Sequence, residues 1–79
     1  MTNDVLFPVT ATEAREAAAL FVKQTPYADV DYLIDAAVRS FSWGEDVINA
    51  LECADDDYTW EEANNARGAI EYHIKELTK

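Results

Sequence analysis

The residues best suited to chemistry in this chain are carboxylates crowded into one short stretch. Half of the sixteen Asp and Glu residues lie between positions 45 and 62, whereas no Lys or Arg occurs between Arg39 and Arg67. These acids alternate with aromatic side chains. The acids are Glu45, Asp46, Glu52, Asp55, Asp56, Asp57, Glu61 and Glu62, and the aromatic residues are Trp43, Tyr58 and Trp60. Carboxylates at this density suit three kinds of chemistry: metal ligation, proton transfer, or contact with a basic surface.

A calcium loop is one use for such a stretch, and the spacing argues against it. With Asp55 as the first ligand of an EF-hand-like loop, Asp57 takes the third position. Trp60 then falls where the loop needs Gly, and Ala66 falls where it needs a bidentate Glu. One Cys and one His are too few for a four-ligand structural zinc site. We therefore expect no metal and no other cofactor.

The same residues do not form a recognisable catalytic arrangement. Glu45 with Asp46, and Glu61 with Glu62, are neighbours in sequence, so their side chains diverge on a helix and do not converge on one proton. The single Cys, Cys53, has no base beside it in the sequence, and two Gly cannot form a Gly-rich phosphate loop. We expect a protein that is not an enzyme.

Recognition of a basic partner accounts best for the acidic stretch. Uncompensated like charge destabilises a compact domain, and residues 41–79 carry −7 of the total charge of −10. Nucleic acids and anionic membranes would be repelled, since both need Lys or Arg to displace their counterions. Solvation by acids near helix N-termini is the competing interpretation. The predicted contact surface comprises Glu45, Asp46, Glu52, Asp55, Asp56, Asp57, Tyr58, Glu61 and Glu62.

Four helices after a short arm are expected to position these residues. Residues 1–9 predict an extended arm that packs as a lid over the helices, and residues 10–79 predict an all-α bundle in a single domain. Three capping boxes support this, because each pairs a hydroxyl with a carboxylate three residues later. The boxes are Thr10 with Glu13, Ser42 with Glu45, and Thr59 with Glu62. The expected helices are 11–24, 26–41, 43–53 and 60–77, with Asp29 as an alternative start for the second.

Apolar side chains recur at helical spacing and predict the core. The strongest period is Val30, Leu33, Ile34, Ala37, Val38 and Phe41. The other stripes are Ala14, Ala17, Ala18, Phe21 and Val22; Trp43, Val47, Ile48, Leu51 and Ala54; and Trp60, Ala63, Ala66, Ile70, Ile74 and Leu77. We expect Trp43 and Trp60 to close the ends of this core, and we expect Cys53 to lie outside it.

A second candidate interface lies on the outer face of the last helix. Tyr72 projects away from the apolar stripe there, on the same face as Gly68. A Gly inside a helix costs about 1 kcal/mol relative to Ala, so Gly68 needs a reason. Close approach of a partner's backbone is one such reason, and tolerated surface variation is the other.

The chain is similar in outline to the acyl carrier proteins, as an acidic four-helix protein of this length. The segments Ala50-Leu51-Glu52 and Ala69-Ile70-Glu71-Tyr72 resemble the second half of that family. The family's Asp-Ser-Leu attachment motif aligns with Ser40-Phe41-Ser42, where Phe41 replaces the serine. The resemblance therefore implies a carrier-like fold without pantetheine attachment.

The overall profile resembles that of phage-encoded inhibitors of bacterial defence, including anti-CRISPR proteins and DNA mimics. Such proteins are short, very acidic, poor in Cys and free of motifs. The resemblance implies an inhibitor that blocks a basic nucleic-acid-binding surface of a larger complex in the host-cell cytoplasm. The alternative is an acidic carrier-like or adaptor-like interaction domain, with a homodimer left open.

The first nine residues also bear on the compartment. They contain an acid and a Pro where a secretory signal has a basic end and a long apolar run. No stretch approaches the roughly 20 apolar residues of a membrane span. We expect a cytoplasmic protein with no membrane contact.

Overall fold

The structure is a computed structural model that describes residues 6–53 and 56–79. Within these ranges the chain forms four helices and no strand. The helices are α1 (Ala11–Gln24), α2 (Val30–Arg39), α3 (Gly44–Cys53) and α4 (Asp57–Leu77). The prediction of an all-α bundle of four helices is confirmed.

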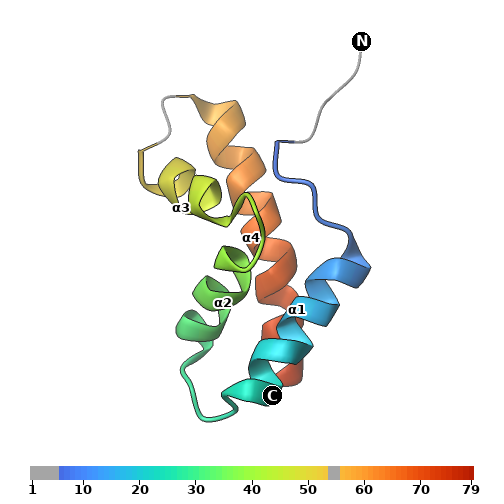
Figure 1. The fold of residues 1–79 in the computed structure, drawn as a ribbon. Coiled ribbons are helices and arrows are strands. Elements are labelled where there is room, and N and C mark those ends of the chain that lie inside the picture. The colour runs from blue at the N-terminus through green and yellow to red at the C-terminus, as the bar shows by residue number, and fades with distance from the viewer. Residues whose placement is uncertain (1–5, 54–55) are drawn as a thin grey trace.

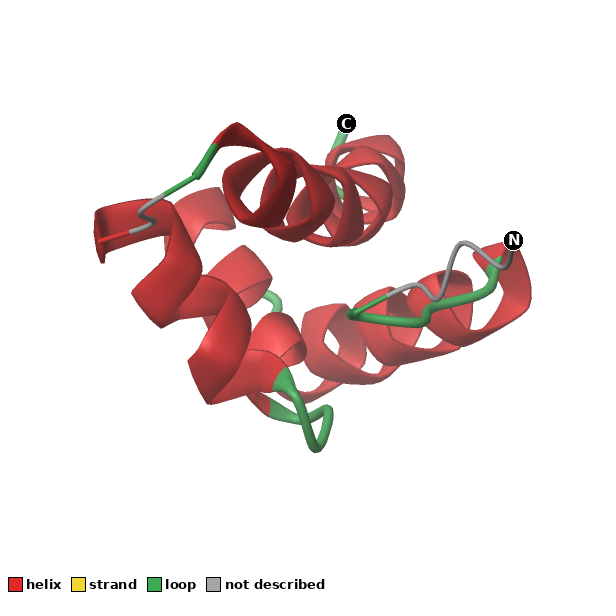
Figure 2. Cartoon of the chain, turned by 90° about the horizontal axis from the view of Figure 1, so that it is seen from above, coloured by secondary structure: helices red, strands yellow, loops and turns green. Residues whose placement is uncertain are grey.

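The longest helix, α4, organises the other three (Figure 1). It contacts α1, α2 and α3, and α2 also contacts both α1 and α3. Among the described residues, α1 and α3 make no contact with each other. Seen from above, α4 lies on one side of the molecule and the other helices lie across from it (Figure 2). The core is therefore the space between α4 and the rest.

The first helix begins and ends as its sequence predicts. Thr10 N–H donates to Glu13 Oε1 at 3.0 Å, and Glu13 N–H donates to Thr10 Oγ1 at 3.1 Å, which confirms the first capping box. Ala14 and Ala18 are fully buried. Because these side chains are small, α1 can pack closely against α4.

The second helix begins at Val30, so the predicted start at residue 26 is wrong and the alternative at Asp29 is correct. The reason lies in Thr25, which completes α1 and does not begin α2. Thr25 Oγ1 donates to the carbonyl of Phe21 at 3.0 Å, and the Thr25 carbonyl accepts from Ala28 N–H. A turn thus separates the two helices. The predicted end at Phe41 is also two residues too late, since α2 ends at Arg39.

The third helix begins without the predicted Ser42–Glu45 box. The first helical bond runs from Val47 N–H to the carbonyl of Trp43, so the cap position is Trp43. The Glu45 carboxylate bonds to Arg39 instead. Gly44 starts the helix directly on the backbone of α2, because a Cβ built on Gly44 would lie 2.6 Å from the Arg39 Cα.

The fourth helix begins three residues earlier than predicted, and the Thr59–Glu62 box is wrong. Asp56 is the N-cap, with Oδ1 accepting from Thr59 N–H at 2.7 Å. Thr59 Oγ1 donates to Asp56 Oδ2 at 3.2 Å. Asp ranks above Thr as an N-cap, which explains why α4 starts after Asp56 and not after Thr59.

All buried apolar residues among those described lie on the predicted stripes except Phe7 and Ala50, and several members of the stripes are only half-buried or exposed. Trp60 and Leu77 were expected inside, but they are 45% and 47% exposed. Leu51 is only half-buried, and Ala54 lies outside the described residues. Cys53 is exposed, as expected. The buried apolar residues are Phe7, Ala14, Ala18, Leu33, Ile34, Ala37, Val38, Val47, Ala50, Ala63, Ala66, Ile70 and Ile74.

The described part of the arm packs onto the helices, as predicted. Phe7 is buried, and its ring centroid lies 6.0 Å from that of Trp43. Trp43 stacks on Phe41 at 4.6 Å and donates from Nε1 to the Pro8 carbonyl at 3.1 Å. Trp43 therefore joins the arm to the link between α2 and α3.

The two glycines should respond oppositely to a methyl group. Gly44→Ala should lower the free energy of unfolding by about 1–3 kcal/mol, because the added Cβ meets α2 backbone that cannot move aside. Gly68→Ala should raise it by about 0.4–1 kcal/mol, because a Cβ there meets no described atom within 4 Å. Urea unfolding of both variants measures the difference. Equal midpoints would contradict the close contact at Gly44.

Core truncation should distinguish full from partial burial. Leu33 has no exposed surface, so Leu33→Ala should cost about 2–5 kcal/mol and can unfold so small a domain. Leu51→Ala should cost less, since half-buried Leu51 leaves a smaller cavity. Thermal unfolding followed by circular dichroism tests the order, and a larger loss at Leu51 would show that the burial is misassigned.

Candidate functional site

The described acids of the predicted surface lie at four places on α3 and α4. Glu45 and Asp46 are exposed in the first turn of α3, and Glu52 is exposed near its end. Asp56, Asp57, Tyr58 and Glu61 are exposed at the start of α4. Glu62 is half-buried and lines a hollow beside the arm, together with Phe7 and Asn65. Asp55 lies outside the described residues. Of the described acids of this surface, Glu62 is the one that is half-buried, and the others are exposed.

One acid of this set is compensated, contrary to the expectation from sequence. Arg39 Nε donates to Asp35 Oδ2 at 2.9 Å, and Arg39 NH1 bonds to Glu45 Oε2. The hydrogen bond that Arg39 donates to Asp35 raises the pKa of Arg39, and the nearby charge of Glu45 adds to this rise. The i,i+4 pair of Asp35 and Arg39 was expected, but its extension to Glu45 depends on how α3 turns back onto α2.

The Asp56 carboxylate is the N-cap of α4. The backbone N–H of Thr59 is the main reason that the pKa of Asp56 is lowered, and the Thr59 hydroxyl adds to it. The carboxylate thus stays ionised to lower pH and holds the first turn of α4. A charge reversal at Asp56 would disturb the helix itself.

Two aromatic side chains stand exposed at the start of α4. Tyr58 is 54% exposed and Trp60 is 45% exposed. Trp60 lies three residues before buried Ala63 and seven before half-buried Arg67, so it stands at the edge of the apolar stripe. The spacing of apolar residues predicts which side of the helix is buried, but it does not show how wide the buried face is. It therefore does not distinguish a residue at the edge of that face from one at its centre.

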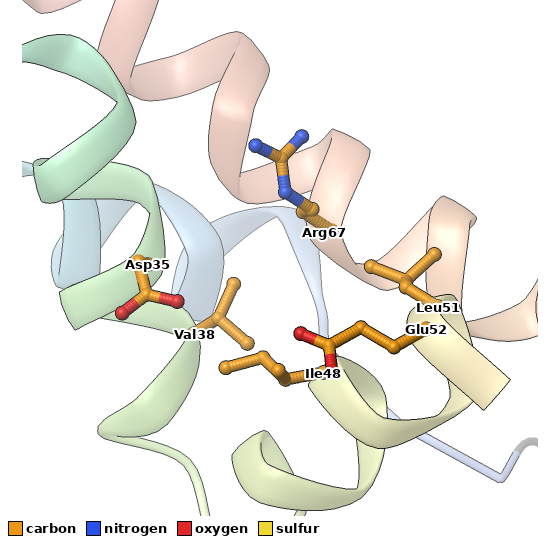
Figure 3. A pocket seen from close by; sticks show the side chains of 6 residues that line it. All are labelled: Asp35, Val38, Ile48, Leu51, Glu52 and Arg67. Carbon is orange, nitrogen blue, oxygen red and sulfur yellow. The ribbon is translucent and has the colours of Figure 1, made fainter.

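A groove of about 190 Å³ opens between α2, α3 and α4 (Figure 3). Its apolar walls are Val38, Ile48 and Leu51, and its charged residues are Asp35, Glu52 and Arg67. Of these, only Glu52 belonged to the predicted surface. Asp35 and Arg67 were missed because each belongs to a different helix, and sequence spacing does not relate them.

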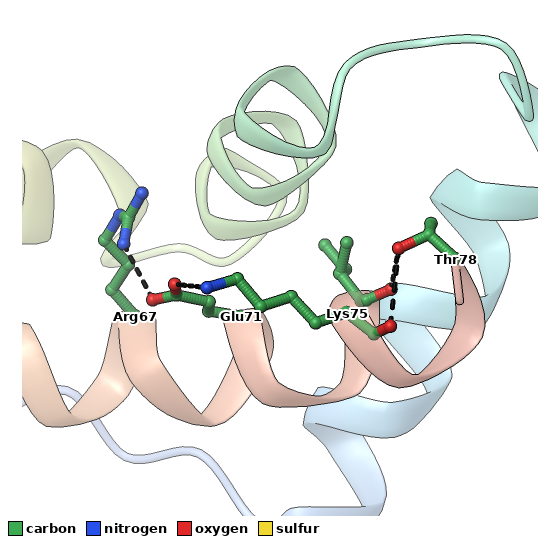
Figure 4. A network of polar contacts seen from close by, with 5 residues as sticks. Arg67, Glu71, Lys75 and Thr78 are labelled. Carbon is green, nitrogen blue, oxygen red and sulfur yellow. Dashed lines mark hydrogen bonds and ion pairs between the residues drawn. The ribbon is translucent and has the colours of Figure 1, made fainter.

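Arg67 belongs to a chain of ion pairs along its own helix (Figure 4). Arg67 NH1 donates to Glu71 Oε1 at 3.0 Å, and Lys75 Nζ lies 2.7 Å from Glu71 Oε2. The hydrogen bond from Lys75 is the main cause of the lowered pKa of Glu71, and Arg67 contributes to it. Thr78 Oγ1 then closes the helix by donating to the Ile74 carbonyl.

The second candidate interface is open in the structure. Among the described residues, no atom of another element stands within 4 Å of a Cβ built on Gly68. Tyr72 is 61% exposed, and its ring meets that of His73 edge-on at 5.1 Å. The packing of the described residues therefore does not require glycine at position 68.

Neutralising Glu71 should make stability less dependent on pH. Because the pKa of Glu71 is lowered in the folded state, its contribution is present above the ordinary Glu value of about 4.3 and is lost as pH falls through the lowered value. Glu71→Gln should cost about 1 kcal/mol or less at pH 7, as expected for two i,i+4 pairs. Urea unfolding at pH 7 and pH 3 measures this. A difference from wild type that does not shrink as the pH falls from 7 to 3 would contradict the ionic origin.

The chemistry of the candidate site is that of exposed carboxylates and aromatic rings. Among residues 6–53 and 56–79, no three His, Cys, Asp or Glu side chains are grouped so as to hold a metal ion. None of the described helices is both long enough and apolar enough to cross a membrane. No protein-family model, curated protein or solved structure matches this chain, so its function must be argued from its own residues.

Proposed function

We propose that this chain is a non-enzymatic inhibitor that binds a basic, nucleic-acid-binding surface of a larger protein. One observation carries the proposal: Tyr58 and Trp60 are exposed at the start of α4, beside the carboxylates of Asp57 and Glu61. Aromatic side chains are common anchors of protein interfaces, and surrounding charges speed the encounter with an oppositely charged partner.

The charge of the whole chain supports the same function. A net charge of −10 repels nucleic acids and attracts surfaces rich in Lys and Arg. Such surfaces exist in proteins to bind the phosphate backbone. Carboxylates that occupy one would compete directly with the nucleic acid. The complexes of bacterial defence systems are the class of partner that the acidic profile favours, with the host-cell cytoplasm as the place of action.

The arrangement of the acids refines the contact surface. The exposed acids at the starts of α3 and α4 are free to face a partner, whereas Glu45 already bonds to Arg39 and Asp56 caps α4. We therefore assign the main contact to Asp46, Asp57 and Glu61, with Tyr58 and Trp60 as anchors.

Neutralising three acids at this surface should weaken binding. The variant Asp46→Asn, Asp57→Asn, Glu61→Gln leaves the Asp56 cap intact, so α4 should still form. The matched control is Glu16→Gln, Asp31→Asn, Glu76→Gln, which removes the same charge from exposed positions elsewhere. Fluorescence anisotropy of labelled DNA or RNA on purified defence complexes measures competition by each variant. The first variant should compete at least about tenfold less well than the control, a loss of about 1.4 kcal/mol.

Higher salt concentration should weaken the competition with DNA or RNA in the same assay. Exposed charges are screened over about 8 Å at physiological ionic strength, so higher salt should weaken inhibition by the wild type more than by the first variant. Equal competition by the variant and its control would show that net charge alone matters. Competition unchanged by both salt and substitution would contradict the electrostatic mechanism.

An adaptor that pairs with a second copy is the alternative function, and the open position at Gly68 favours it. Gly68→Ala fills this position without straining the described fold. If α4 packs against another α4 there, the variant should be more stable as a monomer and dissociate at higher concentration. Sedimentation of wild type and variant decides this.

A further inference from the structure

We infer that the groove between α2, α3 and α4 accepts one Lys or Arg side chain of the basic partner, with the cationic group held at Glu52. This inference rests on the proposed function and adds to it the place where the partner's side chain inserts. It concerns the side of α4 that faces α2 and α3, and not the exposed start of α4.

The walls of the groove suit the hydrocarbon part of such a side chain. Val38 is almost fully buried at the floor, and half-buried Ile48 and Leu51 leave part of their surface open to the groove. Lys and Arg carry three or four methylene groups that pack on apolar surface while the charged end stays near water. A short acidic or polar side chain would leave these walls uncovered.

The charges around the groove favour a cation. Glu52 has no ion-pair partner among the described residues, and its carboxylate stands beside Ile48 (Figure 3). Asp35 shares Arg39 with Glu45, which makes this trio net negative. An anion entering the groove would meet both carboxylates.

Arg67, the cation among the described residues that line the groove, reduces this preference but does not reverse it. Arg67, Glu71 and Lys75 together carry +1, whereas Glu52 carries −1 and the trio of Asp35, Arg39 and Glu45 carries −1, so the surroundings of the groove remain at −1. Arg67 bonds to Glu71, which also holds Lys75, so the guanidinium is turned along α4 (Figure 4). Its side chain is 34% exposed, and it forms one wall of the groove. The ion pair with Glu71 holds the Arg67 guanidinium toward α4, so the entering cationic group is expected at Glu52 and not at Arg67.

The size of the groove limits its occupant. Sites for small-molecule ligands usually measure roughly 300–1,000 Å³, so a groove of about 190 Å³ is small for a cofactor. One long side chain is a better match. The occupant is therefore a residue on the surface of a partner and not a free metabolite.

Methyl NMR of the isolated protein tests the inference without the natural partner. The probe is Nα-acetyl-arginine methylamide at millimolar concentration, and the matched control probe is Nα-acetyl-norleucine methylamide, which is apolar and uncharged. The arginine probe should shift the methyl signals of Val38, Ile48 and Leu51 in a saturable way. The norleucine probe should shift them less at the same concentration.

A pair of variants locates the cation. Glu52→Gln should weaken binding of the arginine probe by about two- to fivefold, the scale of one exposed ion pair. Glu16→Gln removes the same charge from an exposed position on α1, outside both proposed contacts, and should leave the methyl shifts unchanged. Equal effects of the two variants, or methyl signals that ignore the arginine probe, would overturn the inference.

The test separates this inference from the proposed function. In one outcome, the substitutions at Asp46, Asp57 and Glu61 weaken binding of the basic partner, but the arginine probe does not shift the methyl signals of the groove. The groove assignment is then wrong, and the proposed function stands. If the groove binds the probe but no nucleic-acid-binding complex is inhibited, the groove assignment stands and the proposed function is wrong.

Discussion

The burial of one face of α4 is the constraint on which the rest of the structure depends. Ala63, Ala66, Ile70 and Ile74 are almost completely removed from water, and among the described residues α4 is the helix that contacts each of the others. Two of these side chains are only methyl groups, so the neighbouring helices can approach closely. The positions of the groove and of the hollow under the arm both follow from this packing, because they lie on the two sides of the same buried face.

Most ion pairs among the described residues belong to two small networks. Arg39 serves Asp35 and Glu45 together, while Glu71 holds both Arg67 and Lys75. Six bases cannot neutralise sixteen acids, so a negative excess remains on the surface. The exposed acids at the starts of α3 and α4 are favourable to their own helices through the macrodipole. Solvation and recognition are therefore compatible uses of the same residues.

Trp60 connects the fold to the proposed function. An aromatic residue at the first turn of a helix normally completes a core, yet this side chain is almost half exposed because it stands at the edge of the apolar stripe of α4. Exposed beside carboxylates, it has the composition of an interface anchor. Trp43, by contrast, contributes to the fold, because it packs against Phe7 of the arm and donates its N–H to the Pro8 carbonyl.

The sequence by itself determined the number of helices, the first capping box, and most of the buried stripes, because these depend on spacing within one helix. It also determined the negative charge of the second half. The tertiary structure alone decided the contact of Gly44 with the α2 backbone and the meeting of Asp35, Glu52 and Arg67 around one groove. Periodicity places a side chain on a face of its own helix, but it carries no information on which other helix packs there, and that packing brings distant charges together.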